Sequence, residues 1–214
     1  MIGAGPGLGA AVARRFGQSG YDCALIARSP DRLDSLGRDL QAEGITTGWS
    51  AADVTQPRDL TTAIERLADH SGGAINHVHF NPSAFTAKDA LQLSAEELLA
   101  DVHLGVASLL TTVQAARPFM PQGSRVTATG GGTADRPWTK AASLGVQKAA
   151  LRNLVLALDA RLAAEKIRAL TITVAGTIQP GSAFDPALIA EAIYTASRTD
   201  SEFWENDIRF DGLG

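Results

Sequence analysis

The most informative stretch of the chain is residues 1–9, Met1-Ile2-Gly3-Ala4-Gly5-Pro6-Gly7-Leu8-Gly9. The glycine-dense turn leads into a segment in which the apolar residues Leu8, Val12 and Phe16 recur every fourth position, which predicts a helix. Such a turn leaves backbone N–H groups free at a helix N-terminus, where they and the helix dipole attract a phosphate. The spacing Gly3-x-x-x-Gly7-x-Gly9 is not G-x-G-x-x-G, so the loop alone is compatible with a phosphate site or with a simple tight turn.

Strand-like apolar runs alternate with helical patterns along the rest of the chain, as expected for a parallel sheet with helices on both faces. The predicted strands are residues 22–27, 46–51, 75–80, 125–129, 169–174 and 207–210. The predicted helices are residues 9–19, 30–43, 57–70, 95–116, 142–164 and 186–197. No repeat, low-complexity tract or linker interrupts them. We therefore expect an α/β fold with a doubly wound parallel sheet (a Rossmann fold) in a single domain over residues 1–214.

The first strand of this sheet is shorter than the fold requires. A phosphate loop ordinarily follows a complete central strand, yet only Met1 and Ile2 precede Gly3. A truncated central strand would leave its two neighbours without hydrogen-bond partners and would open the core. Two interpretations follow: residues are missing upstream of Met1, or the fold tolerates a stub strand.

Composition and charge exclude several classes of function. The 214 residues are 45% hydrophobic and carry a net charge of −4, which argues against nucleic acid or an anionic membrane as a partner. We find no apolar run that we expect to span a bilayer and no export leader, so we expect a cytoplasmic protein. The single cysteine, Cys23, is interpreted as a small core residue. His77 and His79 alternate on one strand face without a third ligand nearby, so we predict no metal site.

Five motifs, taken in chain order, resemble those of the short-chain dehydrogenase/reductase family over essentially the whole length. They are Gly3, Gly7 and Gly9; Asp53-Val54-Thr55; Phe80-Asn81-Pro82-Ser83, in which only Asn81 of the family's Asn-Ala-Gly survives; Gln147-Lys148-Ala149-Ala150-Leu151; and Val174-Ala175-Gly176-Thr177-Ile178. Each motif is weak alone, and their order and spacing carry the resemblance.

The resemblance implies a domain that binds a nicotinamide dinucleotide and acts on a small-molecule substrate. The implied cofactor-binding residues are Gly3, Gly7, Leu8, Gly9, Asp53, Val54, Asn81, Pro82, Lys148, Gly176, Thr177 and Ile178. In the resembled family the helices corresponding to residues 95–116 and 142–164 form a two-fold interface, which implies a homodimer or homotetramer.

The residues after the second strand favour one dinucleotide over the other. NAD-using relatives of this fold end that strand with an acidic residue that binds the ribose hydroxyls. Here the strand ends in Arg28-Ser29, with no carboxylate. A guanidinium offers charge and paired donors to a 2′-phosphate, and a serine adds a hydroxyl. We therefore add Arg28 and Ser29 to the cofactor site and predict NADP(H) rather than NAD(H), although Arg28 is also compatible with a solvated strand end. Arg14, Arg15 and Arg32 are interpreted as solvated.

The catalytic pattern of the resembled family is largely absent. The position four residues before Lys148 holds Leu144 instead of tyrosine, and the serine position falls in Gly130-Gly131-Gly132. The asparagine position holds His103. Leucine neither donates nor accepts a proton, so the usual acid for carbonyl reduction is missing. The predicted catalytic residues are Lys148, which also binds ribose in the family, and His103, whose imidazole titrates near neutrality.

Three functions remain open on these residues. The first is an NADP(H)-dependent oxidoreductase acting on a small, apolar ketone, imine or activated alkene, with another proton source or with an iminium ion that needs none. The second is a non-redox enzyme on the same scaffold. The third is an inactive dinucleotide-binding sensor or subunit, because a fold alone does not decide function. Trp138 and Phe184 suggest an apolar pocket, with residues 178–186 as a flap.

Overall fold

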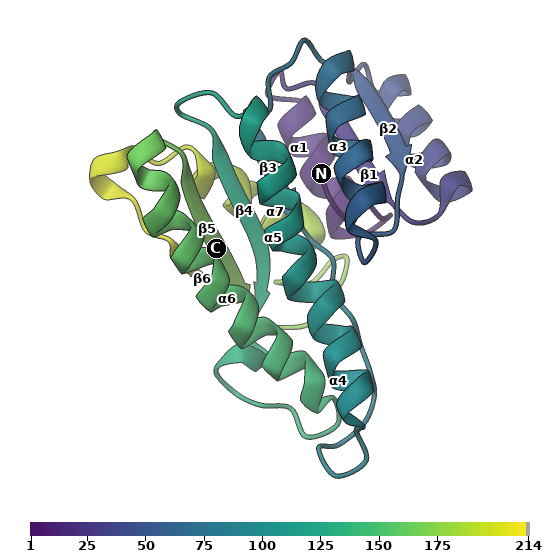
Figure 1. The fold of residues 1–214 in the computed structure, drawn as a ribbon, viewed down its shortest axis with the longest axis vertical. Helices are drawn as coiled ribbons and strands as arrows, with labels where there is room; N and C mark the ends of the chain where they lie inside the picture. The colour runs from purple at the N-terminus through teal and green to yellow at the C-terminus, as the bar shows by residue number, and fades with distance from the viewer. Residues whose placement is uncertain (213–214) are drawn as a thin grey trace.

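The computed structural model describes residues 1–212, which form a parallel sheet covered by helices on both faces (Figure 1). The strands are β1 (Cys23–Ala27), β2 (Thr47–Ala51), β3 (His77–Phe80), β4 (Arg125–Gly131), β5 (Arg168–Val174) and β6 (Asp207–Phe210). β1 pairs with β2, and β3, β4, β5 and β6 follow one another in parallel. Ile2 joins the two sets, because it forms parallel bridges with Ile26 and Phe80.

The helices follow the predicted pattern closely. They are α1 (Leu8–Gly17), α2 (Pro30–Ala42), α3 (Pro57–His70), α4 (Ala95–Val102), α5 (Ser108–Ala116), α6 (Ala142–Leu162) and α7 (Pro186–Ser197). A π turn, His103–Ala107, joins α4 to α5. Single 3-10 turns lie at Arg117–Phe119, Gly132–Ala134, Ala163–Glu165 and Ser201–Phe203.

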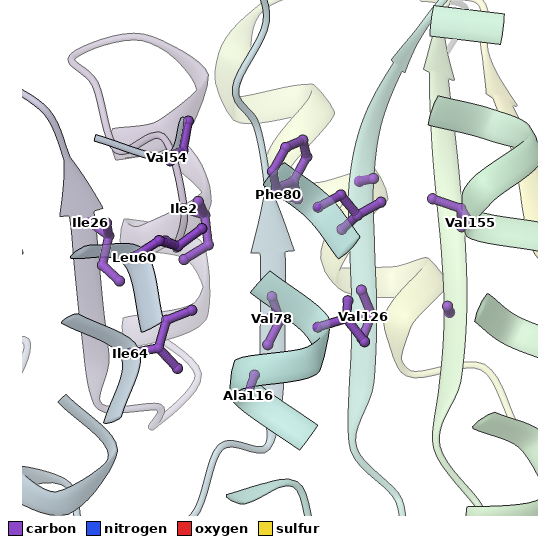
Figure 2. Packing of buried hydrophobic residues seen from close by; sticks show 14 of the residues in the cluster. Ile2, Ile26, Val54, Leu60, Ile64, Val78, Phe80, Ala116, Val126 and Val155 are labelled. Atoms are coloured by element: carbon purple, nitrogen blue, oxygen red, sulfur yellow. The ribbon is translucent and has the colours of Figure 1, made fainter. Parts of the chain in front are cut away.

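Two helical layers enclose the sheet. On one face α1 packs against α7, and the periodic residues Leu8, Val12 and Phe16 are buried there against β5. On the other face α3, α5 and α6 cover a cluster that includes Leu60, Val126 and Val155 (Figure 2). The central strands β4 and β5 are buried on both faces, as parallel strands between helical layers must be. These layers confirm the doubly wound α/β fold in a single domain.

The predicted helix over residues 95–116 is longer and less regular than expected. It begins with a capping box between Ser94 and Glu97 and continues through the π turn and α5 to Phe119. By length and composition alone Ala95–Phe119 is able to cross a bilayer, so the expectation that no run would qualify was wrong on that criterion. Core helices of soluble proteins pass the same test, and this segment packs against α3 and α6.

The backbone of Met1 and Ile2 forms a two-residue stub in the position of a central strand. Ile2 N–H donates to the His79 carbonyl at 2.8 Å, and Ile26 N–H donates to the Met1 carbonyl at 2.9 Å. Beside the stub lies a cavity of about 770 Å³, lined by residues of β1 and β3. The stub therefore holds the two parts of the sheet together, and the opening expected beside a short central strand is present.

Candidate functional site

A crevice of about 950 Å³ lies at the carboxyl ends of the strands. It is lined by residues that directly follow a strand or bridge: Gly3 after Ile2, Arg28 after β1, and Asn81 after β3. Val54 of the segment beyond β2 and Pro82 also line it. Ligands of open α/β sheets bind in this position. The crevice therefore brings together predicted cofactor residues from three of the five motifs, together with Arg28 and Ser29 at the end of β1. The other predicted cofactor residues are not among those that line it: Gly7, Leu8, Gly9, Asp53, Lys148, Gly176, Thr177 and Ile178.

The three motif glycines of the first loop differ in what surrounds them, so they are glycine for different reasons. Gly3 has a φ of +77°, and a Cβ there would lie 2.9 Å from the Pro82 nitrogen. A Cβ on Gly9 would lie 3.0 Å from the Gly3 carbonyl oxygen. In contrast, a Cβ on Gly7 would meet no atom within 4 Å, and no side chain caps α1 at this residue. Gly7 and Leu8 therefore present the N-terminus of α1 to open space, where an anion binds most readily.

Two arginines line the crevice at what we call the outer end of the site. Arg28 follows β1, and Arg32 lies in the first turn of α2. None of the ion pairs formed within residues 1–212 involves either of them. Ser29, the N-cap of α2, also lines the crevice, and its side chain makes no capping hydrogen bond. Within the part of the chain that the structure describes, the site therefore holds two guanidinium groups without an ion-pair partner, beside a hydroxyl.

The sequence analysis interpreted Arg32 as a solvated residue and did not predict that it would lie at the crevice. Arg32 is exposed, but it lines the crevice, and its spacing of four residues from Arg28 was the available signal. Arg14 also lines the crevice, but it forms a two-bond ion pair with Glu43. Arg15 pairs with Glu191.

Asp53 forms hydrogen bonds with Thr55, two residues further along the chain. One of its carboxylate oxygens accepts hydrogen bonds from the Thr55 backbone N–H at 2.9 Å and the Thr55 hydroxyl at 2.8 Å. The backbone bond lowers the pKa of Asp53, and the nearby charges of Arg28 and His103 lower it further. Asp53 thus fixes the turn that places buried Val54 at the crevice.

Lys148 is buried at the inner end of the site. Its ammonium donates to the Thr129 carbonyl at 2.8 Å, and desolvation lowers its pKa to about 8. The Thr129 hydroxyl donates to Asn81 Oδ1 at 2.9 Å, and Asn81 Nδ2 donates to the Gly3 carbonyl at 3.3 Å. Thr129, which the sequence motifs did not single out as a site residue, therefore connects Lys148 to the glycine loop.

The two histidines of β3 lie beside the hydroxyls of Thr127 and Thr129 on β4. The His79 ring nitrogens lie 3.1 Å from the Thr129 hydroxyl and 2.7 Å from the Thr127 hydroxyl. His77 Nε2 lies 2.9 Å from the same Thr127 hydroxyl. Desolvation lowers the pKa of His79 to about 3 and that of His77 well below its ordinary value. Residues 1–212 contain no group of three metal-ligating side chains that could include this pair.

The catalytic end lacks the groups that carbonyl reduction ordinarily uses. Leu144 lies half-buried one helical turn before Lys148, and Gly131 faces the stem of that lysine, since a Cβ there would lie 3.4 Å from Lys148 Cγ. Both tyrosines of the chain, Tyr21 and Tyr194, pack against Phe16 on the α1 and α7 face. No phenol therefore stands beside Lys148.

Other polar groups at this end differ in exposure. His103 is exposed at the start of the π turn, and the next residue, Leu104, lines the crevice. The Thr133 hydroxyl is buried and has no hydrogen-bond partner among the described residues. Gln147 is fully buried, and its side-chain oxygen accepts from the Ser83 hydroxyl at 3.0 Å.

The segment after β5 is shaped by aromatic packing. A Cβ on Gly176 would lie 2.2 Å from the Phe184 ring, so this position needs glycine. Phe184 also packs against Phe210, with ring centroids 6.0 Å apart. Thr177 and Ile178 are exposed and are not among the residues that line the crevice. The aromatic ring predicted for a substrate pocket therefore holds the flap to the sheet.

Sequence comparisons place the chain among known proteins. A family profile described as enoyl-(acyl carrier protein) reductase matches residues 3–194. An oxidoreductase of Mycobacterium tuberculosis is 31% identical over 160 residues, which cover 71% of this chain and 58% of that protein. Tropinone reductase-like 3 of Erythroxylum coca is 28% identical over 158 residues, which cover 73% and 61%. The chain thus spans less than two thirds of the length of these relatives.

Solved structures show the same fold at lower identity. A short-chain dehydrogenase of Burkholderia cenocepacia in complex with NADP has a TM-score of 0.88 at 22% identity, covering 99% of this chain and 94% of that one. An NADPH-bound short-chain oxidoreductase of Pseudomonas aeruginosa, described as containing an atypical catalytic center, has a TM-score of 0.91 at 18% identity, with coverage of 99% and 93%.

The fold and the crevice define a doubly wound α/β domain with a ligand site at the carboxyl ends of its strands. The family match extends over most of the chain and agrees with both sets of relatives. The chain belongs to the short-chain dehydrogenase/reductase family.

Proposed function

We propose that this chain is an NADP(H)-dependent oxidoreductase that transfers hydride to or from a small, apolar substrate without a tyrosine acid. The observation that carries the proposal is the crevice itself, in which residues 3–6 of the loop that leads into α1 lie together with Arg28 and Arg32. Neither arginine forms an ion pair within residues 1–212. A bound NADP(H) would supply or accept the hydride. The similar structures from Burkholderia cenocepacia and Pseudomonas aeruginosa contain NADP and NADPH, which supports this choice of cofactor.

The residues of this chain fit the parts of such a cofactor. The backbone at Gly7 and Leu8 would hold the diphosphate, and Arg28 with Ser29 and Arg32 would hold the 2′-phosphate through charge-assisted hydrogen bonds. Asn81 keeps the glycine loop in place, because its side chain donates to the Gly3 carbonyl. Lys148 would bind the ribose hydroxyls from its buried position.

The missing acid restricts the substrates that the site can turn over. Reduction of a ketone needs a proton for the developing alkoxide, and Leu144 offers none. Protonated imines accept hydride without that proton, so they are the favoured substrates. Lys148, whose pKa is lowered to about 8, is the candidate proton donor for activated alkenes at neutral pH. The exposed ring pair Phe85 and Trp138, with centroids 5.8 Å apart, supports an apolar substrate.

A second candidate function is an inactive NADP(H)-binding subunit or sensor. Leu144 and the glycines at 130–132 favour it, because they remove reacting groups and leave the crevice intact. We further propose that copies of the chain associate through α4, α5 and α6, where Leu99, Leu110 and Val146 are exposed apolar residues.

Calorimetric titration with NADPH and NADH tests the cofactor assignment. We expect NADPH to bind more tightly, and we expect Arg28→Ala to weaken NADPH binding by about 10- to 100-fold, as for the loss of a charged hydrogen bond, with NADH little changed. Arg38→Ala is the matched control, because Arg38 lies on α2 and pairs with Asp34. Equal loss of both cofactors in Arg28→Ala would contradict the 2′-phosphate role. Turnover of imines, but not ketones, would separate the enzyme from the sensor.

A further inference from the structure

An unbroken series of hydrogen bonds, which we call the histidine–threonine chain, runs from the amino end of β3 to the glycine loop. Its members in order are the His77 ring, the Thr127 hydroxyl, the His79 ring, the Thr129 hydroxyl, the Asn81 side-chain amide and the Gly3 carbonyl, with successive atoms 2.7 to 3.3 Å apart. Asn81 and Gly3 line the crevice, whereas His79 is buried and is not among the residues that line it. The chain therefore connects the core to the candidate site.

The Gly3 carbonyl fixes the direction of the whole series. A carbonyl oxygen only accepts, so the Asn81 amide must present Nδ2 to Gly3 and Oδ1 to Thr129. The Thr129 hydroxyl has one proton, which it donates to Asn81 Oδ1 at 2.9 Å. The same hydroxyl lies 3.1 Å from His79 Nε2, so there its oxygen must accept, and His79 Nε2 must carry a proton.

The same reasoning defines the tautomers of both histidines. Desolvation lowers the pKa of each ring, so both are neutral at pH 7, and a neutral imidazole carries a single N–H. With the proton of His79 on Nε2, its Nδ1 accepts from the Thr127 hydroxyl at 2.7 Å. The Thr127 oxygen then accepts from His77 Nε2 at 2.9 Å. Each ring therefore holds its proton on Nε2, and every bond points toward the glycine loop.

The end of the histidine–threonine chain holds the peptide that starts the phosphate loop. The Asn81 side chain fixes the Gly3 carbonyl, and a Cβ on Gly9 would lie only 3.0 Å from that oxygen, so its position constrains the first turn of α1. The Thr129 backbone carbonyl accepts from the Lys148 ammonium at 2.8 Å. Thr129 therefore joins the chain to both ends of the candidate site.

We propose that His79 is a positioning residue for the candidate cofactor site, because its Nε2–H orients the Thr129 hydroxyl and, through Asn81, holds the Gly3 peptide. A side chain at this position that cannot donate would let the Thr129 hydroxyl turn away from Asn81, and the glycine loop would lose its support. The effect on nucleotide affinity rests on the proposed NADP(H) function, whereas the direction of the hydrogen bonds does not.

Nitrogen-15 NMR of the ligand-free protein tests the direction, because the shifts of the two ring nitrogens show which one carries the proton. The His79→Gln spectrum, which lacks the His79 signals, assigns them. In the wild type we expect the His79 proton on Nε2. In Thr129→Val, which keeps the carbonyl that Lys148 binds, we expect it on Nδ1, because valine offers no acceptor. Thr129→Ser should restore the wild-type pattern.

Thr171→Val is the matched control for the loss of a buried strand hydroxyl. The Thr171 hydroxyl donates to the Ala128 carbonyl at 3.4 Å and lies outside the histidine–threonine chain. This variant should leave the His79 signals as they are in the wild type.

Amide exchange and nucleotide titration test the positioning role. In Thr129→Val and His79→Leu we expect the Gly3 and Ala4 amides to exchange about threefold faster or more, as for the loss of one hydrogen bond. We expect both variants to bind NADPH and NADH about threefold to tenfold more weakly, since the loop would hold the diphosphate that the two share. Glutamine at position 79 keeps a donor near Nε2, so His79→Gln should lose less than His79→Leu.

Two outcomes would overturn the proposal. A His79 proton on Nδ1 in the wild type would reverse the series. Unchanged exchange at Gly3 and Ala4 in both Thr129→Val and His79→Leu would confine the chain to the core. If either variant fails to fold, the wild-type tautomer and the other variant still decide. If the wild type binds neither nucleotide, the proposed oxidoreductase function fails, while the NMR and exchange results judge the role of His79 independently.

Discussion

The two ends of the candidate site, the crevice and the buried region around Lys148, differ in how much of the family's chemistry they retain. At the outer end the glycine loop, Arg28 and Val54 line one crevice, which we propose holds a phosphorylated dinucleotide. At the inner end Lys148 is in place, but Leu144 and Gly131 stand where a phenol and a hydroxyl would act. Binding and chemistry therefore rest on separable sets of side chains in this fold. Substitutions at one end should therefore leave the function of the other end intact.

Substituting two glycines of the first loop tests the outer end of the site. Gly3→Ala should lower the free energy of unfolding by about 2–4 kcal/mol, because an L residue is strained at φ +77° and its Cβ would meet Pro82. Gly7→Ala should cost less, about 1 kcal/mol, because its Cβ meets open space and only the preference for glycine over alanine at the N-cap of α1 is lost. It should nevertheless weaken NADPH binding about tenfold, by obstructing the phosphate.

Urea unfolding and NADPH titration of both variants provide the measurements. A Gly7→Ala variant with normal NADPH affinity would show that the open space at the start of α1 is not a phosphate site. A stable Gly3→Ala variant would show instead that the loop adapts, and the structural role of Gly3 would then be wrong.

The pH dependence of stability tests the histidines that lie beside Thr127 and Thr129 at the inner end of the site. Burial lowers the pKa of His79 to about 3 from an ordinary value of 6.5, so below pH 6.5 the unfolded chain binds a proton that the folded chain does not. Stability should therefore fall as pH drops from 7 to 5, with about 2 kcal/mol of the loss due to His79.

Comparing variants isolates this contribution from those of His77 and the amino terminus. His79→Gln should reduce the loss of stability between pH 7 and pH 5, whatever its effect on stability at pH 7. His70→Gln is the control for the loss of an exposed imidazole. Identical pH dependence in wild type and His79→Gln would mean that His79 accepts a proton within the folded protein.

Much of the fold could be predicted from the sequence because its elements are strongly patterned. The runs around Cys23–Ala27 and Arg168–Val174 are apolar and bounded by helical segments, so their existence and order followed directly. The π turn at His103–Ala107 could not be predicted, because no periodicity distinguishes it from the helices on either side. The cavity beside Met1 was expected from the short first strand, but the two-residue bridge that closes the sheet was visible only in three dimensions.

The site was predictable where a motif follows a strand and less so where contacts are long-range. Gly3, Arg28 and Asn81 meet because parallel strands end at one edge. The positions of Arg32 and Thr129 depend on a helix start and on pairing between β3 and β4, which the local sequence does not encode. The roles of all the predicted site residues remain predictions, among them those of the exposed residues His103, Thr177 and Ile178.

The smallest expected effect is a gain of ketone reduction when the missing acid is restored at the inner end of the site. Leu144 lies half-buried one turn before Lys148, and a Cβ on Gly131 would make an ordinary contact, at 3.4 Å, with the lysine stem. The double variant Leu144→Tyr with Gly131→Ser should therefore fold and reduce ketones about tenfold faster than wild type, since a placed acid lowers the barrier to alkoxide formation. Leu144→Phe with Gly131→Ser is the matched control that lacks only the phenol hydroxyl. If both double variants bind NADPH and neither gains ketone reduction, more than the acid has been lost at this end, and the inactive subunit or sensor becomes the better account of the chain.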